Sequence, residues 1–324
     1  MKLYIVGKGA VGTYFGDLLQ AAGVEVAYAP RALEDVTPFD ADVALITTKA
    51  YDTDGAIETL RRAIAFPQKC VFVTPQNGVG NEEKLAAAFG TDNVMAAALT
   101  TPVDRDRDGH ATAANEGGLA VAPMGASAYN WLVAAFAAAG LNVKVVEDWR
   151  SLKWSKLALN VVANASCAIL NVLPNRLVNF EKVFTLEIRM IREVRAVMAA
   201  MDIAAIDLPR YPVRALFGVS SLPSPIARGL LSRSIAAARG TKPPSLLIDL
   251  RGAKTQTEVM VLNGAVAAFG RERGIPVPVN TVYARVLDDI AHTPPLWAKY
   301  RERPETLEGE VVAEMKRAKA LARQ

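Results

Sequence analysis

The chain has 324 residues, of which 51% are hydrophobic and 22% charged, and its net charge is +4 at pH 7. This length allows two domains with separate cores. A mild charge, with no dense run of Lys and Arg among aromatic residues, argues against a nucleic-acid-binding protein. Two cysteines and two histidines, without a CxxC pair or a His/Cys cluster, argue against a disulfide framework and a metal site. Acid–base chemistry would therefore use Lys, Glu or Asp.

The N-terminal stretch 1–19, MKLYIVGKGAVGTYFGDLL, resembles a signal peptide only superficially, because Lys8 and Asp17 interrupt its apolar run. A charge-free run of about eighteen apolar residues is absent from the sequence, so no membrane span is expected. We therefore expect a cytoplasmic protein.

Short β-type runs alternate with helical patterns up to about residue 147. The expected strands are 3–6, 24–29, 42–48, 70–75, 93–101, 118–124 and 142–146, and the expected helices are 10–22, 54–65 and 127–139. This alternation predicts an α/β domain with a parallel sheet covered by helices on both faces. Only about residues 30–41, with two prolines, remain between the second and third strands, so the crossover helix there should shrink to a turn.

From residue 148 the pattern changes to long helical segments without convincing strands. Helices are expected within 151–170, 180–201 and 255–274. We therefore predict an N-terminal Rossmann-type domain over 1–147 and an all-α substrate-binding domain over 148–324. The tail after about residue 290 combines a proline-containing linker with a charged amphipathic helix, which can pack on the body or join subunits.

A glycine-rich turn follows the first strand and opens the first helix. Gly7, Gly9 and Gly12 stand in GxGxxG spacing. The first glycine permits the tight turn, the second lets the backbone approach a pyrophosphate, and the third allows close helix–strand packing. The helix N-terminus supplies N–H groups and a positive dipole end for phosphates. The expected cofactor loop comprises Gly7, Lys8, Gly9, Ala10, Val11 and Gly12.

Polar side chains follow three strands at the edge where ligands bind in open α/β sheets. After the second strand, YAPRAL supplies Arg31 and no acid, which favours NADP(H) over NAD(H). Lys49 follows the third strand, and Asn77 with Gly78 follows the fourth. Arg31 and Lys49 can also be solvated surface side chains, and Asn77-Gly78 can be an ordinary turn. The shared position of Lys49 and Asn77 at the ligand edge favours binding roles.

The segment 153–170, KWSKLALNVVANASCAIL, carries Lys156, Asn160 and Asn164 at intervals of four. On one helix these side chains follow one another about 40° apart, so they share a face. Buried polar groups need partners, so the stripe is solvated, satisfied by protein groups, or facing a ligand. A later helix is expected to carry Glu258, also in largely apolar surroundings.

These residues fit a reductase chemistry. A lysine near a glutamate can donate a proton to a carbonyl oxygen as hydride arrives at the carbon. Amides and the hydroxyl of Ser245 suit the hydroxyl and carboxylate groups of a small polar acid. Plainer interpretations stay open: Lys156 can extend to water, the asparagines can cap or bridge helices, and Ser245 can be an N-cap.

The stretches that carry these motifs are, in chain order, GKGAVG, TTKAYDT, PQNGVGNEE, SKLALNVVANASCAIL, PPSLLIDLRGAKTQTEVMVLNGAV and GIPVPVN. Together they resemble the ketopantoate reductases (2-dehydropantoate 2-reductases) over roughly residues 1–289. The resemblance implies a Rossmann domain followed by a helical domain, with the active site in the cleft between them. It implies reduction of 2-dehydropantoate to (R)-pantoate with NADPH, a step towards pantothenate and coenzyme A.

The resemblance also implies roles by position. Lys156 resembles the family's general acid, and Glu258 the acid near that lysine and the cofactor ribose. Arg31 and Lys49 match contacts to the phosphate end of NADP. The positions that match substrate contacts are Asn77, which also lies near the nicotinamide, Asn160, Asn164, Asn175 and Ser245. The short second crossover and the tail after about residue 290 depart from the family pattern.

The sequence thus predicts an NADP(H)-dependent reductase whose partner is a small 2-oxo acid, with neither nucleic acid nor membrane as a partner. A homodimer through the helical domain is a candidate assembly. The alternatives are a related reductase of another small branched 2-oxo acid and a non-catalytic NADP(H)-binding sensor. Retention of Lys156 and Glu258 favours an enzyme, because a sensor needs no proton donor.

Overall fold

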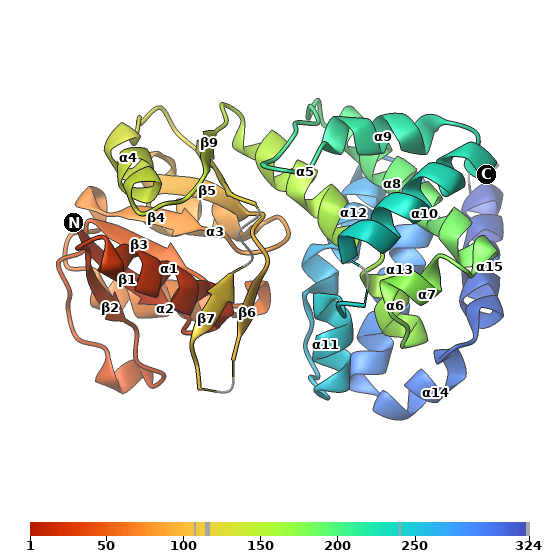
Figure 1. Ribbon diagram of the computed structural model, residues 1–324, viewed down its shortest axis with the longest axis horizontal. Helices are drawn as coiled ribbons and strands as arrows, with labels where there is room; N and C mark the ends of the chain where they lie inside the picture. Colours follow the sequence, from red (N-terminus) through yellow and green to blue (C-terminus); the bar gives the residue numbers. More distant parts are fainter. Residues whose placement is uncertain (107, 114–116, 240, 322–324) are drawn as a thin grey trace. The chain divides into compact units, whose positions relative to one another are not determined.

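The computed structural model describes residues 1–106, 108–113, 117–239 and 241–321. The chain divides into two compact units (Figure 1). The first unit comprises Met1–Lys156 and Ile206–Tyr211, and the second comprises Leu157–Ala205 and Pro212–Gln324. The functional division between residues 1–147 and 148–324 stays a prediction.

The first unit is built on a seven-stranded sheet in the order β2-β1-β3-β4-β5-β8-β9. Its strands are β1 Lys2–Val6, β2 Glu25–Tyr28, β3 Val43–Ile46, β4 Val71–Thr74, β5 Val94–Leu99, β6 Val103–Arg105, β7 Ala111–Ala113, β8 Leu119–Pro123 and β9 Val143–Val145. Its helices are α1 Ala10–Ala21, α2 Thr53–Ala63, α3 Asn81–Phe89 and α4 Asn130–Ala138, and α5 Trp149–Val161 continues into the second unit. The α/β architecture predicted for this half is confirmed.

The expectation of a parallel sheet was wrong for two strands, β8 and β9. Strands β2, β1, β3, β4 and β5 are mutually parallel, but β8 runs antiparallel to β5. Over its described residues, the connection between them holds no helix and instead carries the β6–β7 hairpin. A parallel return normally needs a crossover, usually through a helix, whereas an antiparallel return does not. The outer strand β9 is again parallel to β8, after the crossover through α4.

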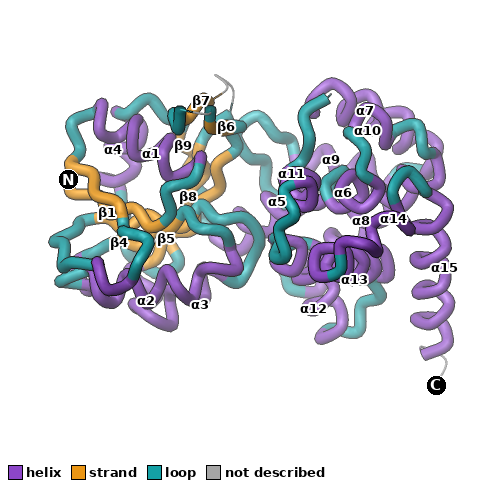
Figure 2. The backbone as a smooth tube through the Cα atoms, turned by 90° about the horizontal axis from the view of Figure 1, so that it is seen from below, coloured by secondary structure: helices purple, strands orange, loops and turns teal. Residues whose placement is uncertain are grey.

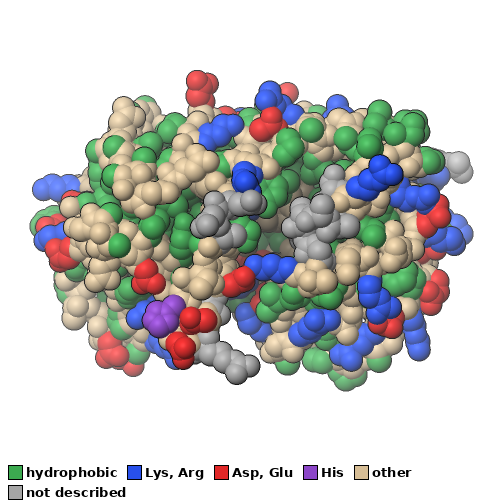
Figure 3. Space-filling view, in the orientation of Figure 1, with side chains coloured by type: hydrophobic (Ala, Val, Ile, Leu, Met, Phe, Trp, Pro, Cys, Tyr) green, Lys and Arg blue, Asp and Glu red, His purple; other side chains and the backbone are tan. Residues whose placement is uncertain are grey.

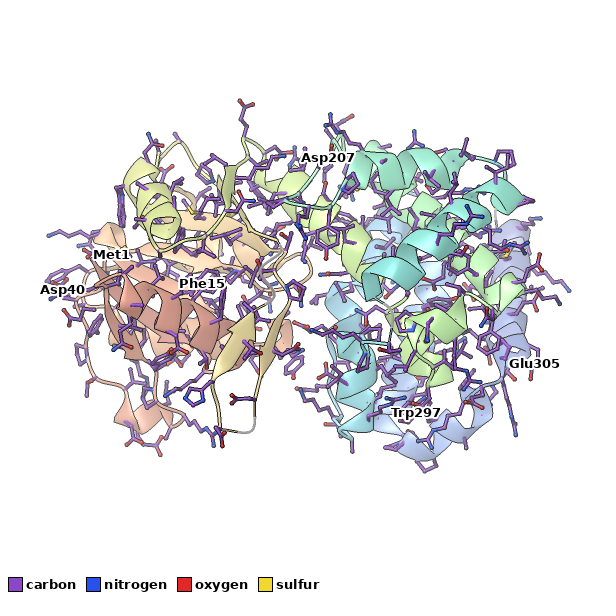
Figure 4. All side chains as sticks on the ribbon, viewed as in Figure 1. Met1, Phe15, Asp40, Asp207, Trp297 and Glu305 are labelled. Carbon is purple, nitrogen blue, oxygen red and sulfur yellow. The ribbon has the colours of Figure 1, made fainter. Side chains whose placement is uncertain are left out.

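Helices cover both faces of this sheet, with α1 and α4 on one side and α2 and α3 on the other (Figure 2). The first face buries Phe15 and Leu19 of α1 together with Phe136 of α4. Phe15, labelled in Figure 4, is fully buried there. The second face buries Leu60 of α2 and Leu85 of α3. Apolar side chains on both faces explain why the strands read as continuous hydrophobic runs.

The shortened second crossover is confirmed. Between β2 and β3 only a 3₁₀ turn forms, η1 Leu33–Asp35. The chain therefore passes from the end of β2 through Arg31 to β3 without a covering helix. The other 3₁₀ turns are η2 Ala50–Asp52, η3 Pro67–Lys69, η4 Thr91–Asn93, η5 Glu258–Val261 and η6 Pro294–Leu296.

The described part of the second unit is helical. Its helices are α6 Ala165–Leu170, α7 Pro174–Leu177, α8 Glu181–Ala200, α9 Val213–Ser221, α10 Ser224–Arg239, α11 Ser245–Arg251, α12 Asn263–Glu272, α13 Pro278–His292, α14 Trp297–Tyr300 and α15 Pro304–Leu321. The all-α prediction for this half is confirmed. None of the helices in the described ranges is long and apolar enough to cross a membrane.

Two of the expected helices are interrupted. The helix expected within 151–170 breaks after α5, because Ala163 has φ of 50° and its N–H donates to the buried Glu187 carboxylate (2.6 Å). The helix expected within 255–274 begins as the 3₁₀ turn η5, and Leu262 (φ −106°, ψ −98°) separates this turn from α12. Glu258 therefore stands on a 3₁₀ turn rather than on a helix.

The C-terminal tail packs on the helical body. The indole nitrogen of Trp297, labelled in Figure 4, donates to the carbonyls of Ala168 (3.0 Å) and Ile169 (2.9 Å) at the end of α6. Leu307 and Val311 of α15 are fully buried. The predicted tail helix is confirmed over α15, and the last predicted residues, 322–324, lie outside the described part of the chain.

Glu193 on α8 is a buried carboxyl that caps a neighbouring helix. It accepts hydrogen bonds from the backbone N–H groups of Val279 (3.1 Å) and Asn280 (3.0 Å) in the first turn of α13. Burial raises the pKa of Glu193 to about 7, although these hydrogen bonds and the charge of Arg189 act in the opposite direction. The folded state therefore binds this proton more tightly than the unfolded chain does.

This raised pKa predicts a pH-dependent stability. A carboxyl whose pKa is higher in the folded state favours folding at low pH, and that contribution is lost as pH rises through the folded pKa. We expect the free energy of unfolding to fall by on the order of 1 to 3 kcal/mol between about pH 5 and about pH 8. Urea unfolding across this range measures the fall. The variant Glu193→Gln should flatten it, and an unchanged slope in that variant would assign the effect to other groups.

Candidate active site

The glycine-rich turn between β1 and α1 has the geometry that a phosphate-binding loop needs. Gly7 has φ of 106°, which favours glycine, and the hydroxyl of Thr47 donates to its carbonyl (2.6 Å). A Cβ on Gly12 would overlap that same carbonyl oxygen, so the first turn of α1 packs directly against the turn. A Cβ on Gly9 would meet no atom within 4 Å. The backbone at Gly9 is therefore open to a ligand.

The N-terminus of α1 is electrostatically prepared for an anion. Gly9 is its N-cap and supplies no side-chain hydrogen bond, and the first turn carries no acidic residue. Its N–H groups and the positive end of its dipole are favourable for a phosphate group. Lys8 is exposed in the same turn, with its ammonium 4.8 Å from the ring centre of Tyr28 at the end of β2.

A second group of polar residues stands where β3 and β4 end. The buried Gln76 donates from its amide to the Thr48 carbonyl (3.1 Å) and the Thr53 hydroxyl (3.0 Å), and accepts from Thr74 (2.9 Å). These bonds tie the segment after β4 to the segment after β3. The neighbouring Asn77 is half-buried, and its carbonyl accepts from the Asn81 side chain (3.1 Å).

The structure places the two predicted phosphate-end cations after β2 and β3, the two strands that flank β1 in this sheet. Lys49 is half-buried and forms the N-cap of η2, while Arg31 is exposed three residues beyond the end of β2. The carboxyl ends of parallel strands form the edge at which ligands bind in such sheets. Arg31 and Lys49 therefore both border the ligand edge of the first unit. Gly78 has φ of 82°, so Asn77-Gly78 also makes the turn that its sequence suggested.

Lys156 lies on α5, at the end of the first unit, and is half-buried. One turn earlier, Lys153 is fully buried and forms an ion pair with Glu82 of α3 (2.8 Å). Its ammonium also donates to the carbonyl of Gln76 (2.6 Å). The helix that carries Lys156 is therefore fastened to the segment that precedes Asn77.

In the second unit, three predicted substrate residues come together. The amide nitrogen of Asn164 donates to the carbonyl of Asn160 (3.0 Å) and, more weakly, to the hydroxyl of Ser245 (3.4 Å). We call Asn160, Asn164 and Ser245 the amide cluster. Asn164 is buried, whereas Asn160 and Ser245 are half-buried.

The structure corrects the helix-cap interpretation of Ser245. The N-cap of α11 is Pro244, and Ser245 is its first residue. The oxygen of Asn164 instead accepts the N–H of Leu246 (3.1 Å), because the break after α5 turns that side chain towards α11. Within the described residues, Asn175 makes no hydrogen bond to the amide cluster and is exposed on α7.

Glu258 is buried at the start of η5, with 3% of its surface exposed. The preceding Thr257 caps this turn by accepting the N–H of Val259 (3.4 Å). A carboxylate this deeply buried loses its hydration, so it needs polar or charged partners to offset that cost. Its expected proximity to Lys156 stays a prediction.

Sequence reasoning missed the residues that brace the site. The sequence motifs did not identify Lys153, Glu82 and Gln76, although all three lie within or beside the stretches that carry those motifs. One signal was available, because Lys153 interrupts the apolar pattern of the same helix as Lys156. Glu187, which holds the break before Asn164, gave no local signal.

Charge on the surface is mixed. On the face seen in Figure 3, Lys and Arg side chains are interspersed with Asp and Glu rather than gathered. Over the residues that the structure describes, no group of three or more His, Cys, Asp or Glu side chains is arranged to hold a metal ion.

A largely parallel sheet with an open glycine turn, followed by a helical unit, is an architecture typical of Rossmann-type oxidoreductases. Two family models match the chain: "Ketopantoate reductase PanE/ApbA" over residues 25–126 and "Ketopantoate reductase PanE/ApbA C terminal" over residues 148–291. The chain belongs to the ketopantoate reductase family and is an oxidoreductase of the type that acts on CH–OH groups.

Individual relatives extend this match. A 2-dehydropantoate 2-reductase of Archaeoglobus fulgidus is 29% identical over 86% of this chain and 94% of its own length. A crystal structure of a PanE/ApbA family ketopantoate reductase from Ralstonia eutropha JMP134 is 28% identical, covers 90% of this chain and 99% of its own, and superposes with a TM-score of 0.72. D-mandelate dehydrogenase in complex with NADH shares the fold at 18% identity, with coverages of 90% and 99% and a TM-score of 0.73.

Proposed function

We propose that this protein reduces 2-dehydropantoate to (R)-pantoate with NADPH, a step towards pantothenate and coenzyme A. The observation that carries the proposal is the match to proteins named 2-dehydropantoate 2-reductase, which extends over 86% of the chain in two archaeal relatives. The residues that the proposal needs are present and stand on elements that can present them. Cytoplasmic location and a homodimer through the helical unit remain expectations.

The first unit fits a dinucleotide. The open backbone at Gly9 and the uncapped N-terminus of α1 suit a pyrophosphate. We assign this contact to the loop Gly7, Lys8, Gly9, Ala10, Val11 and Gly12. When bound, the nicotinamide supplies the hydride, and the protein supplies binding, orientation and a proton.

The choice of NADPH over NADH rests on the end of β2. An acid that would accept the ribose hydroxyl is absent there: Glu25 opens the strand, and the next acids, Glu34 and Asp35, lie in η1. Arg31 is exposed beside this end and suits a 2′-phosphate. We assign Lys49 to the same phosphate end of the cofactor.

Lys156 is proposed as the general acid. Its ammonium would donate a proton from Nζ to the ketone oxygen as the neighbouring carbon receives hydride, so that no free alkoxide forms. Glu258 would accept hydrogen bonds from the ammonium and the cofactor ribose, and Asn77 would orient the nicotinamide and the substrate. A half-buried lysine is suited to this role because it stays accessible while water is partly excluded.

The amide cluster is proposed to bind the substrate's polar groups. Asn160 and Ser245 are half-buried and can present an amide and a hydroxyl, while Asn164 is already engaged with Leu246, Ser245 and the Asn160 backbone. We therefore assign direct contact to Asn160 and Ser245, and to Asn164 the task of holding them. Asn175, exposed on α7, is retained as a further substrate contact.

A related reductase of another branched 2-oxo acid is the second candidate. It is favoured by the structural likeness to D-mandelate dehydrogenase, which shows that this fold also serves an enzyme named for a different 2-hydroxy acid. A non-catalytic NADP(H) sensor would leave the amide cluster and Lys156 without a task.

A substrate panel distinguishes these functions. We expect purified protein to oxidise NADPH faster with 2-dehydropantoate than with other branched 2-oxo acids, because the amide cluster can bind its hydroxyl as well as its carboxylate. Initial rates are followed by NADPH absorbance, and kcat/KM is compared across the panel. A higher kcat/KM for another acid would move the assignment to that acid, and NADPH binding without turnover on any acid would indicate a sensor.

A further inference from the structure

Among the described residues of the first unit, the most completely buried charges belong to the ion pair of Lys153 and Glu82. Their side chains are 1% and 0% exposed, and the ammonium lies 2.8 Å from the carboxylate. The residues come from α5 and from the first turn of α3, which are far apart in the sequence. Replacing such a pair with apolar residues is often neutral or stabilising, so a buried ion pair is weak evidence for a role in stability. We therefore consider whether this pair holds neighbouring residues in position rather than stabilising the fold.

The ammonium of Lys153 has further partners that show what it holds. It donates to the carbonyl of Gln76 (2.6 Å), in the loop after β4, and to the carbonyl of Ala97 (3.3 Å) in β5. The ammonium therefore makes two hydrogen bonds to backbone carbonyls beside its ion pair with Glu82. One side chain therefore joins α5 to α3, to β5 and to the β4–α3 loop, residues 75–80.

The carboxylate of Glu82 is placed where its charge is tolerated. It lies in the first turn of α3, where the helix dipole favours a negative charge. Burial raises the pKa of Glu82, and the charge of Lys153 and its hydrogen bond act in the opposite direction. The pair is therefore mutually dependent, and removing one partner leaves an uncompensated buried group.

The β4–α3 loop transmits this contact to Asn77. Gln76 is fixed on both sides, since its carbonyl is held by Lys153 and its amide is bonded to Thr48 and Thr53. Asn77 follows directly, so its position depends on that peptide. On α5, Lys156 lies one turn beyond Lys153, so the same anchor fixes the helix that carries it.

We propose that Lys153 and Glu82 are positioning residues that set Asn77 and Lys156 relative to each other in the first unit. The functional part of this inference rests on the proposed function. Neither side chain touches the substrate, because both are fully buried in contacts with protein groups. Small displacements of reacting groups have large effects on rate, so loss of the anchor should lower kcat more than it weakens cofactor binding.

The test uses a double variant, Lys153→Met with Glu82→Leu, which removes both charges and preserves the approximate volume. Hydrogen–deuterium exchange of the β4–α3 loop should accelerate by about tenfold or more, because the Gln76 carbonyl loses its donor. The kcat for the 2-oxo acid should fall by about tenfold or more, while the Kd for NADPH, measured by fluorescence, stays within about twofold. The milder variant Glu82→Gln, which keeps Lys153, should shift both readouts in the same direction.

The matched control is Lys84→Met with Asp54→Leu, an exposed ion pair (2.7 Å) between α3 and α2 of the same unit. It should leave loop exchange and kcat unchanged. The proposal would be overturned if the β4–α3 loop of the folded double variant exchanged at the wild-type rate. It would also be overturned if the loop exchanged faster while kcat stayed at the wild-type value. A wild type without turnover on any 2-oxo acid would refute the proposed function instead, and the exchange measurement would still decide whether the pair holds the loop.

Discussion

Replacing Lys156 with alanine is expected to lower kcat by about 100-fold or more, while NADPH still binds with nearly its original affinity. A positioned general acid typically contributes on the order of 10² to 10⁴ in rate. Without the ammonium, the ketone oxygen must take its proton from water as hydride arrives. Steady-state rates give kcat, and a fluorescence titration gives the Kd for NADPH.

Two further variants sharpen this experiment. Lys156→Arg keeps the positive charge but holds its proton too tightly to donate it, so it should also be slow. Lys316→Ala, an exposed lysine on α15, is the control and should match the wild type. A primary amine added to the Lys156→Ala variant should restore part of the rate. If the Lys156→Ala variant turned over at a near-normal rate without added amine, Lys156 would have a packing role instead.

The variant Arg31→Ala is expected to raise the KM for NADPH by about 10- to 100-fold and to change the KM for NADH little. Hydrogen bonds to charged groups contribute about 1.5 to 3 kcal/mol, and only NADPH carries the 2′-phosphate that Arg31 would bind. Saturation curves with each cofactor at a fixed concentration of 2-oxo acid measure the two effects.

The control for Arg31 is Arg61→Ala, which removes another exposed arginine of the first unit, on α2, and should affect neither cofactor. The phosphate contact should also be salt-sensitive, because exposed charges are screened. Equal losses for NADPH and NADH would contradict the phosphate role, and the cofactor preference would then need another explanation.

Local features of the fold could be predicted from the sequence. The glycine spacing, the apolar strand runs and the proline-containing segment between β2 and β3 each reflect interactions within a few residues. For that reason the seven strands of the main sheet, α1 and the short crossover were predicted close to their observed bounds, whereas α3 and the β6–β7 hairpin were not predicted. The direction of β8 was not, because it depends on pairing with β5 rather than on its own composition.

The candidate site was predictable as a set of residues but not as an arrangement. Asn160 and Asn164 were expected on one continuous helix, yet the carboxylate of Glu187, 24 positions beyond Ala163, holds the break between them. The bond between Asn164 and Ser245 spans 81 positions and was visible only in the folded chain. Lys153 donates to a carbonyl 77 positions away, so no local pattern could reveal its task.

The proposed reaction of this protein is the transfer of hydride from NADPH to C2 of 2-dehydropantoate. The most direct measurement supplies NADPH carrying deuterium at C4, on the pro-R or the pro-S position in separate reactions, and analyses the product by mass spectrometry. We expect pantoate with deuterium at C2 from one of the two labelled cofactors and not from the other. Absence of deuterated pantoate from both reactions would show that the protein does not catalyse this hydride transfer.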